Sequence, residues 1–413
     1  MSAALQEDGL QLVFERAADP YSSWWQRPFH YDMETGVGAP ILVPEDAWVE
    51  DFALSPDGST VAFSSRYNLL GLEDHDGYTS HVYLYDMATA TMRSITVDSE
   101  FSNHTPMFSA DGSTLVFTEN PGIWDENAPR PDVIVHDLES GTNTNITDVG
   151  NGGYYHWAME VSNDGSKVVY RQETNPHPWL WDDSDPFIVD SDLFVHDRTT
   201  GESIKIADGH HTQEGVGVRV ESAGFIDDNS KLVFTRGEGS GIESDVLIFD
   251  LETGTTTTIG HGAGHVSAHG STIVYTTAGI TVGSGQNNLY GRFGDVFAYD
   301  LKTGITTSIT EGSDGGIAGL RLSADESKVI FSSNATNLID GEVDLNGDTS
   351  DVFIFDMESG ALANITSGGN GDSFVGGISA DGSRAIFTSH ATNLVEGVID
   401  TNGNQLDVFV FEI

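Results

Sequence analysis

Short runs of alternating apolar and polar residues recur along the whole chain. One such run begins at a small turn, such as PDG or ADG, and ends on an aromatic residue. That aromatic residue occurs eight times, at spacings of 41 to 64 residues: Phe14, Phe63, Phe117, Tyr170, Phe234, Tyr275, Phe331 and Phe387. Alternation at a period of two is typical of a half-buried β-strand. The pattern therefore predicts eight related β units.

Each unit contains further short strands around this run. A second run follows it, as in VLIFDLETG or VFIFDMESG, and its Asp and closing Gly suit a tight turn. A third run such as TSIT or ANIT comes next, and a short run such as VEDFALS precedes the first. No segment has sustained helical periodicity. Each unit is therefore predicted to hold four antiparallel strands, from an inner strand to an outer one.

Eight such units predict an all-β fold, a β-propeller of four-stranded antiparallel blades, because one unit cannot bury both faces of its own sheet. A β-solenoid and two stacked sandwiches are the alternatives. Eight blades with a three-stranded last blade are favoured, and seven would result if the N-terminal unit completed the last blade. A single propeller domain is expected over residues 1–413, with repeat units at approximately 1–48, 49–98, 99–149, 150–208, 209–260, 261–311, 312–367 and 368–413.

The repeat SPDGSTVAFSS, followed by VYLYDM and SIT, resembles the TolB-like propeller repeat, a relative of the WD-repeat propellers. The resemblance is specific at four turns: Asp57–Gly58, Asp111–Gly112, Asp164–Gly165 and Asp381–Gly382. It departs at 227–229 and 325–326, where the turn glycine is missing. The resemblance implies the fold and not an activity, because such propellers serve both as binding platforms and as domains attached to enzymes.

Composition narrows the possible partners. The chain has 17 Lys and Arg against 64 Asp and Glu, a formal charge of −47. Such a field repels nucleic acid and anionic membranes, and neither is expected as a partner. The acidity indicates a hydrated, halophilic surface or oxygen ligands for hard cations. The absence of cysteine excludes disulfides and thiolate metal sites. No apolar run approaches the length of a membrane span. The chain is expected to be a monomer.

Three loops between the second and third strands are rich in Asp and Asn around a glycine, as in DLNGDTSD. Closely spaced carboxylate and amide oxygens around a tight turn are ligands that calcium prefers, although an ordinary β-turn favours the same residues. The predicted calcium ligands lie in units 7, 8 and 2: Asp344, Asn346, Asp348, Asp351, Asp400, Asn402, Asp407, Asp74 and Asp76.

The loops between second and third strands should emerge at the same end of the blades as the connections between units. These segments carry many aromatic residues, which are predicted to bind a glycan or a peptide, since flat rings suit sugar C–H faces and peptide side chains. Packing of each ring over its own loop is the alternative. The predicted ligand-binding residues are Trp24, Trp25, Trp124, Trp179, Trp181, Tyr154 and His104.

Histidines precede several inner strands and are predicted to converge. Such a cluster could bind a transition metal or act as acid and base. The candidate catalytic residues are His156, Tyr155, Arg219 and His210, in a plan similar to that of propeller polysaccharide lyases. No G-x-S-x-G, P-loop or H-E-x-x-H motif is present.

The sequence thus favours a secreted or periplasmic binding propeller, stabilised by calcium, that recognises a glycan or a peptide at its long loops. No signal peptide is visible at Met1, where neither a basic start nor an apolar segment occurs. A metal- or His-dependent polysaccharide lyase is the first alternative. A structural repeat domain of a cell-surface assembly is the second.

Overall fold

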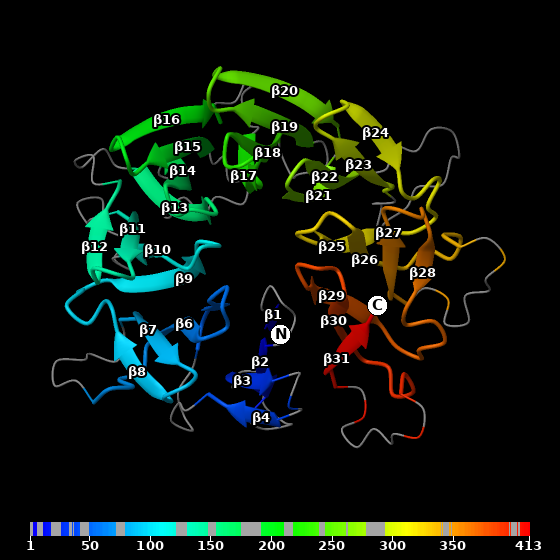
Figure 1. Ribbon diagram of the computed structural model, residues 1–413, viewed down its shortest axis with the longest axis horizontal. Coiled ribbons are helices and arrows are strands. Elements are labelled where there is room, and N and C mark those ends of the chain that lie inside the picture. Colours follow the sequence, from blue (N-terminus) through cyan, green and yellow to red (C-terminus); the bar gives the residue numbers. More distant parts are fainter. Residues whose placement is uncertain are drawn as a thin grey trace, which may run out of the picture. The chain divides into compact units, whose positions relative to one another are not determined.

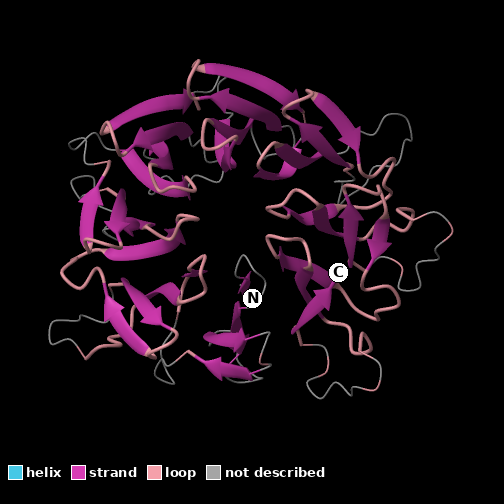
Figure 2. Cartoon of the chain, in the orientation of Figure 1, coloured by secondary structure: helices cyan, strands magenta, loops and turns pink. Residues whose placement is uncertain are grey.

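The computed structural model describes residues 3–5, 11–17, 26–32, 35, 37–41, 49–71, 79–120, 130–147, 154–174, 191–209, 218–238, 244–261, 263–277, 294–339, 341, 347, 349–395, 397, 403 and 405–413. These residues form β-strands and turns and contain no helix (Figure 2). Two compact units divide the chain, with the boundary between Phe225 and Ile226.

The first unit contains four antiparallel sheets whose strands are paired in chain order (Figure 1). The first sheet is β1 (Ala3–Leu5), β2 (Gln11–Ala17), β3 (Gln26–Asp32) and β4 (Val37–Pro40). The second is β5 (Phe52–Leu54), β6 (Thr60–Ser65), β7 (His81–Asp86) and β8 (Thr91–Ser94). The third is β9 (Ser102–Phe108), β10 (Thr114–Asn120), β11 (Asp132–Asp137) and β12 (Thr142–Asn145). The fourth is β13 (Tyr154–Val161), β14 (Lys167–Thr174), β15 (Ser191–Asp197) and β16 (Glu202–Ala207).

The remaining sheets follow the same order, and the unit boundary falls at the end of the first strand of the fifth sheet. It contains β17 (Val218–Ile226), β18 (Lys231–Glu238), β19 (Ser244–Asp250) and β20 (Thr255–Gly260). The sixth is β21 (Ala263–His269), β22 (Thr272–Thr277), β23 (Val296–Asp300) and β24 (Ile305–Ser308). The seventh is β25 (Ile317–Leu322), β26 (Lys328–Ser333), β27 (Asp351–Asp356) and β28 (Leu362–Asn364). The eighth has three strands, β29 (Ser373–Ile378), β30 (Arg384–Ser389) and β31 (Asp407–Glu412).

The eight sheets confirm the predicted β-propeller and the choice of eight blades over seven. Each sheet lies within one of the predicted repeat units. The N-terminal strand β1 pairs with β2, so it belongs to the first sheet and does not complete the last one. The last blade has three strands, as expected.

In five of the eight sheets, the recurring aromatic residue packs across the sheet onto an aromatic residue of the third strand. Stacked rings join Phe63 to Tyr83, Tyr170 to Phe194, Tyr275 to Phe297, Phe331 to Phe353 and Phe387 to Phe409, with centroids 5.3 to 5.8 Å apart. In every case the two residues are directly opposite in the strand register. Each buried ring contributes about 1.5–3 kcal/mol by leaving water. The periodic aromatic is therefore a core position.

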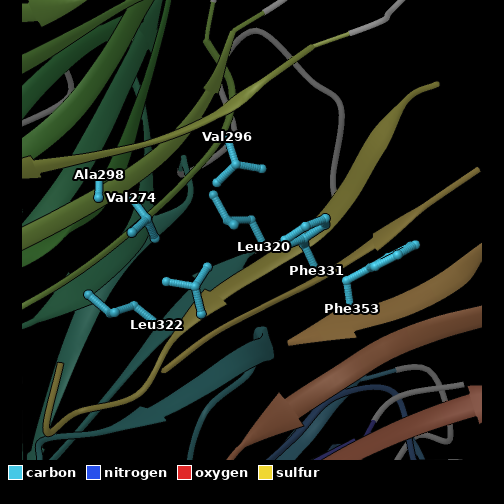
Figure 3. Packing of buried hydrophobic residues seen from close by; sticks show 8 residues of the cluster. Val274, Val296, Ala298, Leu320, Leu322, Phe331 and Phe353 are labelled. Carbon is cyan, nitrogen blue, oxygen red and sulfur yellow. The ribbon is translucent and has the colours of Figure 1, made fainter. Parts of the chain in front are cut away.

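Neighbouring sheets bury their faces against each other. Between the sixth and seventh sheets, Val274, Val296 and Ala298 pack against Leu320, Leu322, Val329, Phe331 and Phe353 (Figure 3). Equivalent apolar clusters join the second sheet to the third, the third to the fourth, and the seventh to the eighth. A blade therefore depends on its neighbours for stability, as expected for a repeat protein.

The turns between first and second strands explain the conserved spacing of the repeat phrase within this chain. In the third sheet, Ser109 Oγ donates to Asp111 Oδ1 at 2.6 Å and accepts from Thr114 N at 3.1 Å. Gly112 takes a φ of 70°, which favours glycine. The same Ser-x-Asp arrangement recurs at Ser55, Ser162, Ser323 and Ser379.

The two departures from the turn motif keep the left-handed conformation without glycine. Glu326 occupies the glycine position at a φ of 63°. Its carboxylate accepts hydrogen bonds from Ser271 and Thr272 of the sixth sheet, which compensates for the strained backbone. Residues 227–229 form a turn in which all three residues have positive φ, between 52° and 64°.

Candidate functional site

The loops between second and third strands and the connections between sheets leave each sheet at the same end of its strands, here called the long-loop end. In the second to fourth sheets, two groups of polar side chains lie at this end. Both occur where a first strand begins, at β9 and at β13.

The first group, the Glu50 cluster, consists of Glu50, Arg66, Ser80 and His104. Arg66 Nε lies 2.6 Å from Glu50 Oε1, and His104 Nδ1 lies 3.1 Å from Glu50 Oε2. Ser80 Oγ donates to the same Oε2 at 2.8 Å. Burial acts to raise the pKa of Glu50, but the hydrogen bonds from His104 and Ser80 and the charge of Arg66 outweigh it and lower that pKa. Glu50 is therefore an anion that orients its three partners.

The Glu50 cluster is open to solvent. The side chain of Arg66 is 55% exposed, and those of His104 and Glu50 are 24% and 21% exposed. The imidazole of His104 is oriented by a carboxylate at Nδ1 while its ring stays accessible. This arrangement can present donors and acceptors to a ligand.

The second group, the Asp132 cluster, consists of Arg130, Asp132, Tyr155 and His156. Alternation along β13 directs Tyr155 and His156 to opposite sides of the sheet. Arg130 Nη1 donates to the Tyr155 hydroxyl at 2.9 Å, and its guanidinium carbon lies 5.1 Å from that ring's centre. His156 Nδ1 lies 3.3 Å from Asp132 Oδ1.

Asp132 is fixed by the fourth strand of its own sheet. Thr147 Oγ1 donates to Oδ1 at 2.9 Å, and Asn145 Nδ2 donates to Oδ2 at 2.9 Å. Burial acts to raise the pKa of Asp132, but hydrogen bonds from His156, Asn145 and Thr147 lower it overall. The aspartate is thus held ionised beside His156.

His156 is enclosed. Its side chain is 7% exposed, and its ring meets Tyr170 edge-on at 5.8 Å. Among the described residues, its Nε2 is buried and has no hydrogen-bond partner. A general base must reach the proton that it removes. The enclosed nitrogen therefore favours a structural role for His156, and His104 is the more accessible imidazole.

The described part of the chain pairs Tyr155 with Arg130 and His156 with Asp132, two partners that were missed. His104 joins the Glu50 cluster, and Tyr154 is 39% exposed at the start of β13. Arg219 lies on β17, with its side chain outside the described part. The remaining predicted ligand-binding and catalytic residues lie outside the described residues: Trp24, Trp25, Trp124, Trp179, Trp181 and His210.

A sequence signal existed for Asp132. An Asp-Val pair lies at or within one residue of the start of five third strands, at Asp132, Asp245, Asp295, Asp351 and Asp407. An acidic residue that recurs at the start of the third strand indicates that this position has the same structural role in several sheets. Arg130 and Glu50 have no comparable repeat.

The predicted calcium ligands are only partly covered by the structure. Asp344, Asn346, Asp348, Asp400, Asn402, Asp74 and Asp76 lie outside the described residues. Asp351 accepts hydrogen bonds from Thr366 at 2.8 Å and Asn364 at 3.0 Å, and Asp407 begins β31. No three His, Asp or Glu side chains within the described ranges are placed to hold a metal ion.

A cavity of about 690 Å³ lies at the opposite ends of the strands, between the second and third sheets. Its walls include Asp57, Asp86 and Asp111, together with Arg93 and Met92. At least one oxygen of each aspartate is held by its own turn. The cavity is separate from both clusters at the long-loop end.

No protein-family model matches the chain. A 151-residue stretch is 28% identical to dipeptidyl-peptidase 5 of Porphyromonas gingivalis, and this stretch covers 35% of the chain and 21% of that protein. The chain therefore matches about a fifth of the length of this curated relative. Its place in a TolB-like repeat family stays a prediction.

Solved structures of similar fold share little sequence. Dipeptidyl peptidase 4 of Porphyromonas gingivalis matches 94% of the chain with 56% of its own length, at a TM-score of 0.61 and 13% identity. An oligogalacturonate lyase in complex with manganese aligns over 87% of the chain and 89% of its own length, with a TM-score of 0.53 and 15% sequence identity. The β-propeller domain of the trilobed protease of Pyrococcus furiosus aligns over 88% of the chain and 97% of its own length, with a TM-score of 0.50 and 12% sequence identity. These likenesses support the β-propeller fold.

None of the described residues forms a helix long and apolar enough to cross a membrane.

Proposed function

We propose that the chain is a binding propeller that recognises a glycan or a peptide at the long-loop end of its second to fourth sheets. The observation that carries the proposal is the accessible Glu50 cluster, in which a fixed carboxylate orients Arg66 and His104 toward solvent. Preorganised polar groups bind without losing much side-chain freedom. The exposed ring of Tyr154 adds a flat apolar surface at the start of the adjacent sheet's first strand.

The charges favour a neutral or mixed-charge ligand. Glu50 and Asp132 contact the basic side chains of the two clusters, so the negative charge of the chain is not locally reversed. A polyanionic ligand would meet repulsion from these carboxylates. Hydroxyl-rich sugars and peptides with both charges suit the mixture of donors and acceptors better.

Binding to glycan and peptide arrays tests this proposal. A selected ligand should bind Arg66→Gln and Tyr154→Ala about tenfold more weakly, the loss expected when a charged hydrogen bond or an aromatic contact is removed. Arg93→Gln, in the cavity at the other strand ends, is the matched control and should bind normally. Equal loss in all three variants, or loss in the control alone, would contradict the proposal.

A second candidate is a polysaccharide lyase. The accessible His104, oriented by Glu50, has the carboxylate–imidazole arrangement of a general base. The likeness in fold to an oligogalacturonate lyase, over 87% of the chain, is consistent with this alternative. Incubation with uronate polysaccharides should then produce absorbance near 235 nm that His104→Ala abolishes and His156→Ala retains. No absorbance with any substrate would leave the binding function alone.

The manganese of that lyase structure has no counterpart in the described side chains, since they supply no set of three metal ligands. A transition metal would therefore depend on residues outside the described ranges, such as His210.

Calcium binding in the acidic loops remains part of the proposal. Gly347 and Gly403 occupy matching positions in two loops and have φ values of 68° and 70°. Both glycines are therefore in the left-handed region that favours glycine, which supports a shared task. Chelation should lower the unfolding temperature, and added calcium should restore it. An unfolding temperature that does not change on chelation would contradict calcium binding in these loops.

A secreted or periplasmic location is proposed together with this ligand class. Fractionation of the producing cells would test it.

A further inference from the structure

The eighth sheet has an open edge. Among the described residues β31 pairs with β30 alone, whereas the third strand of each of the other seven sheets also pairs with a fourth strand. The outward edge of a strand presents unpaired N–H and C=O groups to any extended segment.

The third strand of the eighth sheet is less buried than its counterpart in the seventh. β27 and β31 have nearly the same sequence, DVFIFD and DVFVFE. The first four residues of β27 are buried, but those of β31 are only partly buried and its last two are exposed. Phe411 and Ile413 are 37% and 42% exposed. Part of the apolar surface of β31 is therefore exposed.

Four of the other sheets bind their fourth strand through the same contact. A Val at the start of the third strand donates its N–H to a Thr hydroxyl at 2.9 Å, and its C=O accepts from the N–H of the preceding Ile. The contacts join Val82 to Ile95–Thr96, Val133 to Ile146–Thr147, Val296 to Ile309–Thr310 and Val352 to Ile365–Thr366. The repetition defines a receptor for an Ile-Thr pair.

The residue before the Val adds selectivity for Thr. Asp132, Asp295 and Asp351 each accept a hydrogen bond from the Thr hydroxyl, at 2.8 to 3.1 Å. In two sheets the other carboxylate oxygen also accepts from an Asn two residues before the Thr. A third strand that begins with Asp-Val therefore binds the motif Asn-Ile-Thr through hydrogen bonds of its side chain as well as its backbone.

β31 begins with the same pair in the same register. Asp407 lies opposite Ser389 of β30, as Asp351 lies opposite Ser333 of β26. Val408, Val410 and Glu412 occupy the positions whose backbone faces the fourth strand in the seventh sheet. We propose that this edge binds a neutral, extended peptide segment of a partner protein, antiparallel to β31 and carrying an Ile-Thr pair.

A second copy of the chain is a poor occupant. Each chain carries a formal charge of −47, so two copies repel each other. A neutral segment avoids this repulsion.

The chain's own fourth strand supplies the probe. Residues 360–368 read GALANITSG, and this peptide should be made with blocked ends and a fluorophore. Its anisotropy should rise with added protein and saturate below about 1 mM, a modest affinity for a flexible peptide. Replacing its Thr by Ala should weaken binding about tenfold, because the Val408 N–H loses its partner.

Val408→Pro is the matched variant of the protein. It removes the outward N–H without breaking a bond to β30, because an edge strand accepts Pro at such a position. This variant should unfold at the wild-type temperature and bind the Thr peptide no better than the Ala peptide. Equal binding of the two peptides by the wild type, or no saturable binding, would overturn the proposal. A stable dimer by light scattering that resists competing peptide would also overturn it.

Discussion

At the residue scale, a few polar contacts recur because the repeat recurs. Each Ser-x-Asp turn buries a serine hydroxyl that both donates and accepts, so the sequence could predict it from the spacing alone. The Asp132 and Glu50 clusters differ, because their members come from separate strands and connections. Only the fold brings Arg130 to Tyr155 or Arg66 to Glu50, and no spacing in the sequence indicates these pairs.

The turn serine gives a direct stability prediction. Ser109→Ala should lower the free energy of unfolding by about 1–3 kcal/mol, because the N–H of buried Thr114 loses its acceptor. Ser113→Ala, whose exposed hydroxyl contacts the same aspartate, should change stability by less than about 0.5 kcal/mol. Urea unfolding measures both variants, and equal losses would contradict the role given to Ser109.

The buried carboxyl of Glu160 predicts how folding stability depends on pH. Burial on β13 raises its pKa from 4.5 to about 7. Below pH 4.5 both folded and unfolded states hold the proton. As the pH rises to about 7, the Glu160 carboxyl ionises in the unfolded state before it ionises in the folded state. The folded state therefore loses stability relative to the unfolded state over this range.

The comparison of Glu160→Gln with the wild type isolates this effect from the many other carboxylates. The variant should gain stability relative to the wild type as pH rises from 4.5 to 7, measured by urea unfolding at each pH. A difference that stays constant over this range would contradict the raised pKa.

At the element scale, the alternation of apolar residues predicted every sheet, and the periodic aromatic proved to be the stacked core position. The missing turn glycines at 227–229 and 325–326 did not end the repeat. Glu326 keeps the left-handed turn and binds the sixth sheet through its carboxylate. Such compensation depends on a residue about 55 positions away, which local sequence does not reveal.

The Ile-Thr contact should hold each fourth strand in place. Thr366→Val should lower the free energy of unfolding by about 1–3 kcal/mol, because the buried Val352 N–H and the Asp351 carboxylate lose a partner. Thr307→Val, on the exposed strand β24, is the control and should be nearly neutral. Amide exchange of the seventh sheet should increase in Thr366→Val and not in the control. Unchanged exchange would contradict this role.

At the scale of the whole molecule, net charge is the dominant feature. A formal charge of −47 makes the folded chain repel itself, and salt screens that repulsion. The unfolding temperature should therefore rise as KCl is increased from low to molar concentration. At a pH where many carboxylates are protonated the rise should be smaller. An unfolding temperature that falls with KCl at neutral pH would contradict this expectation.

The central claim is that ligand binds at the long-loop end of the second to fourth sheets. Hydroxyl-radical footprinting of the complex with an array-selected ligand tests it most directly, because Tyr and Met side chains report contact individually. The account predicts protection of Tyr154, with Met92 in the cavity at the other strand ends unaffected. Protection of Met92 with Tyr154 still reactive would contradict it.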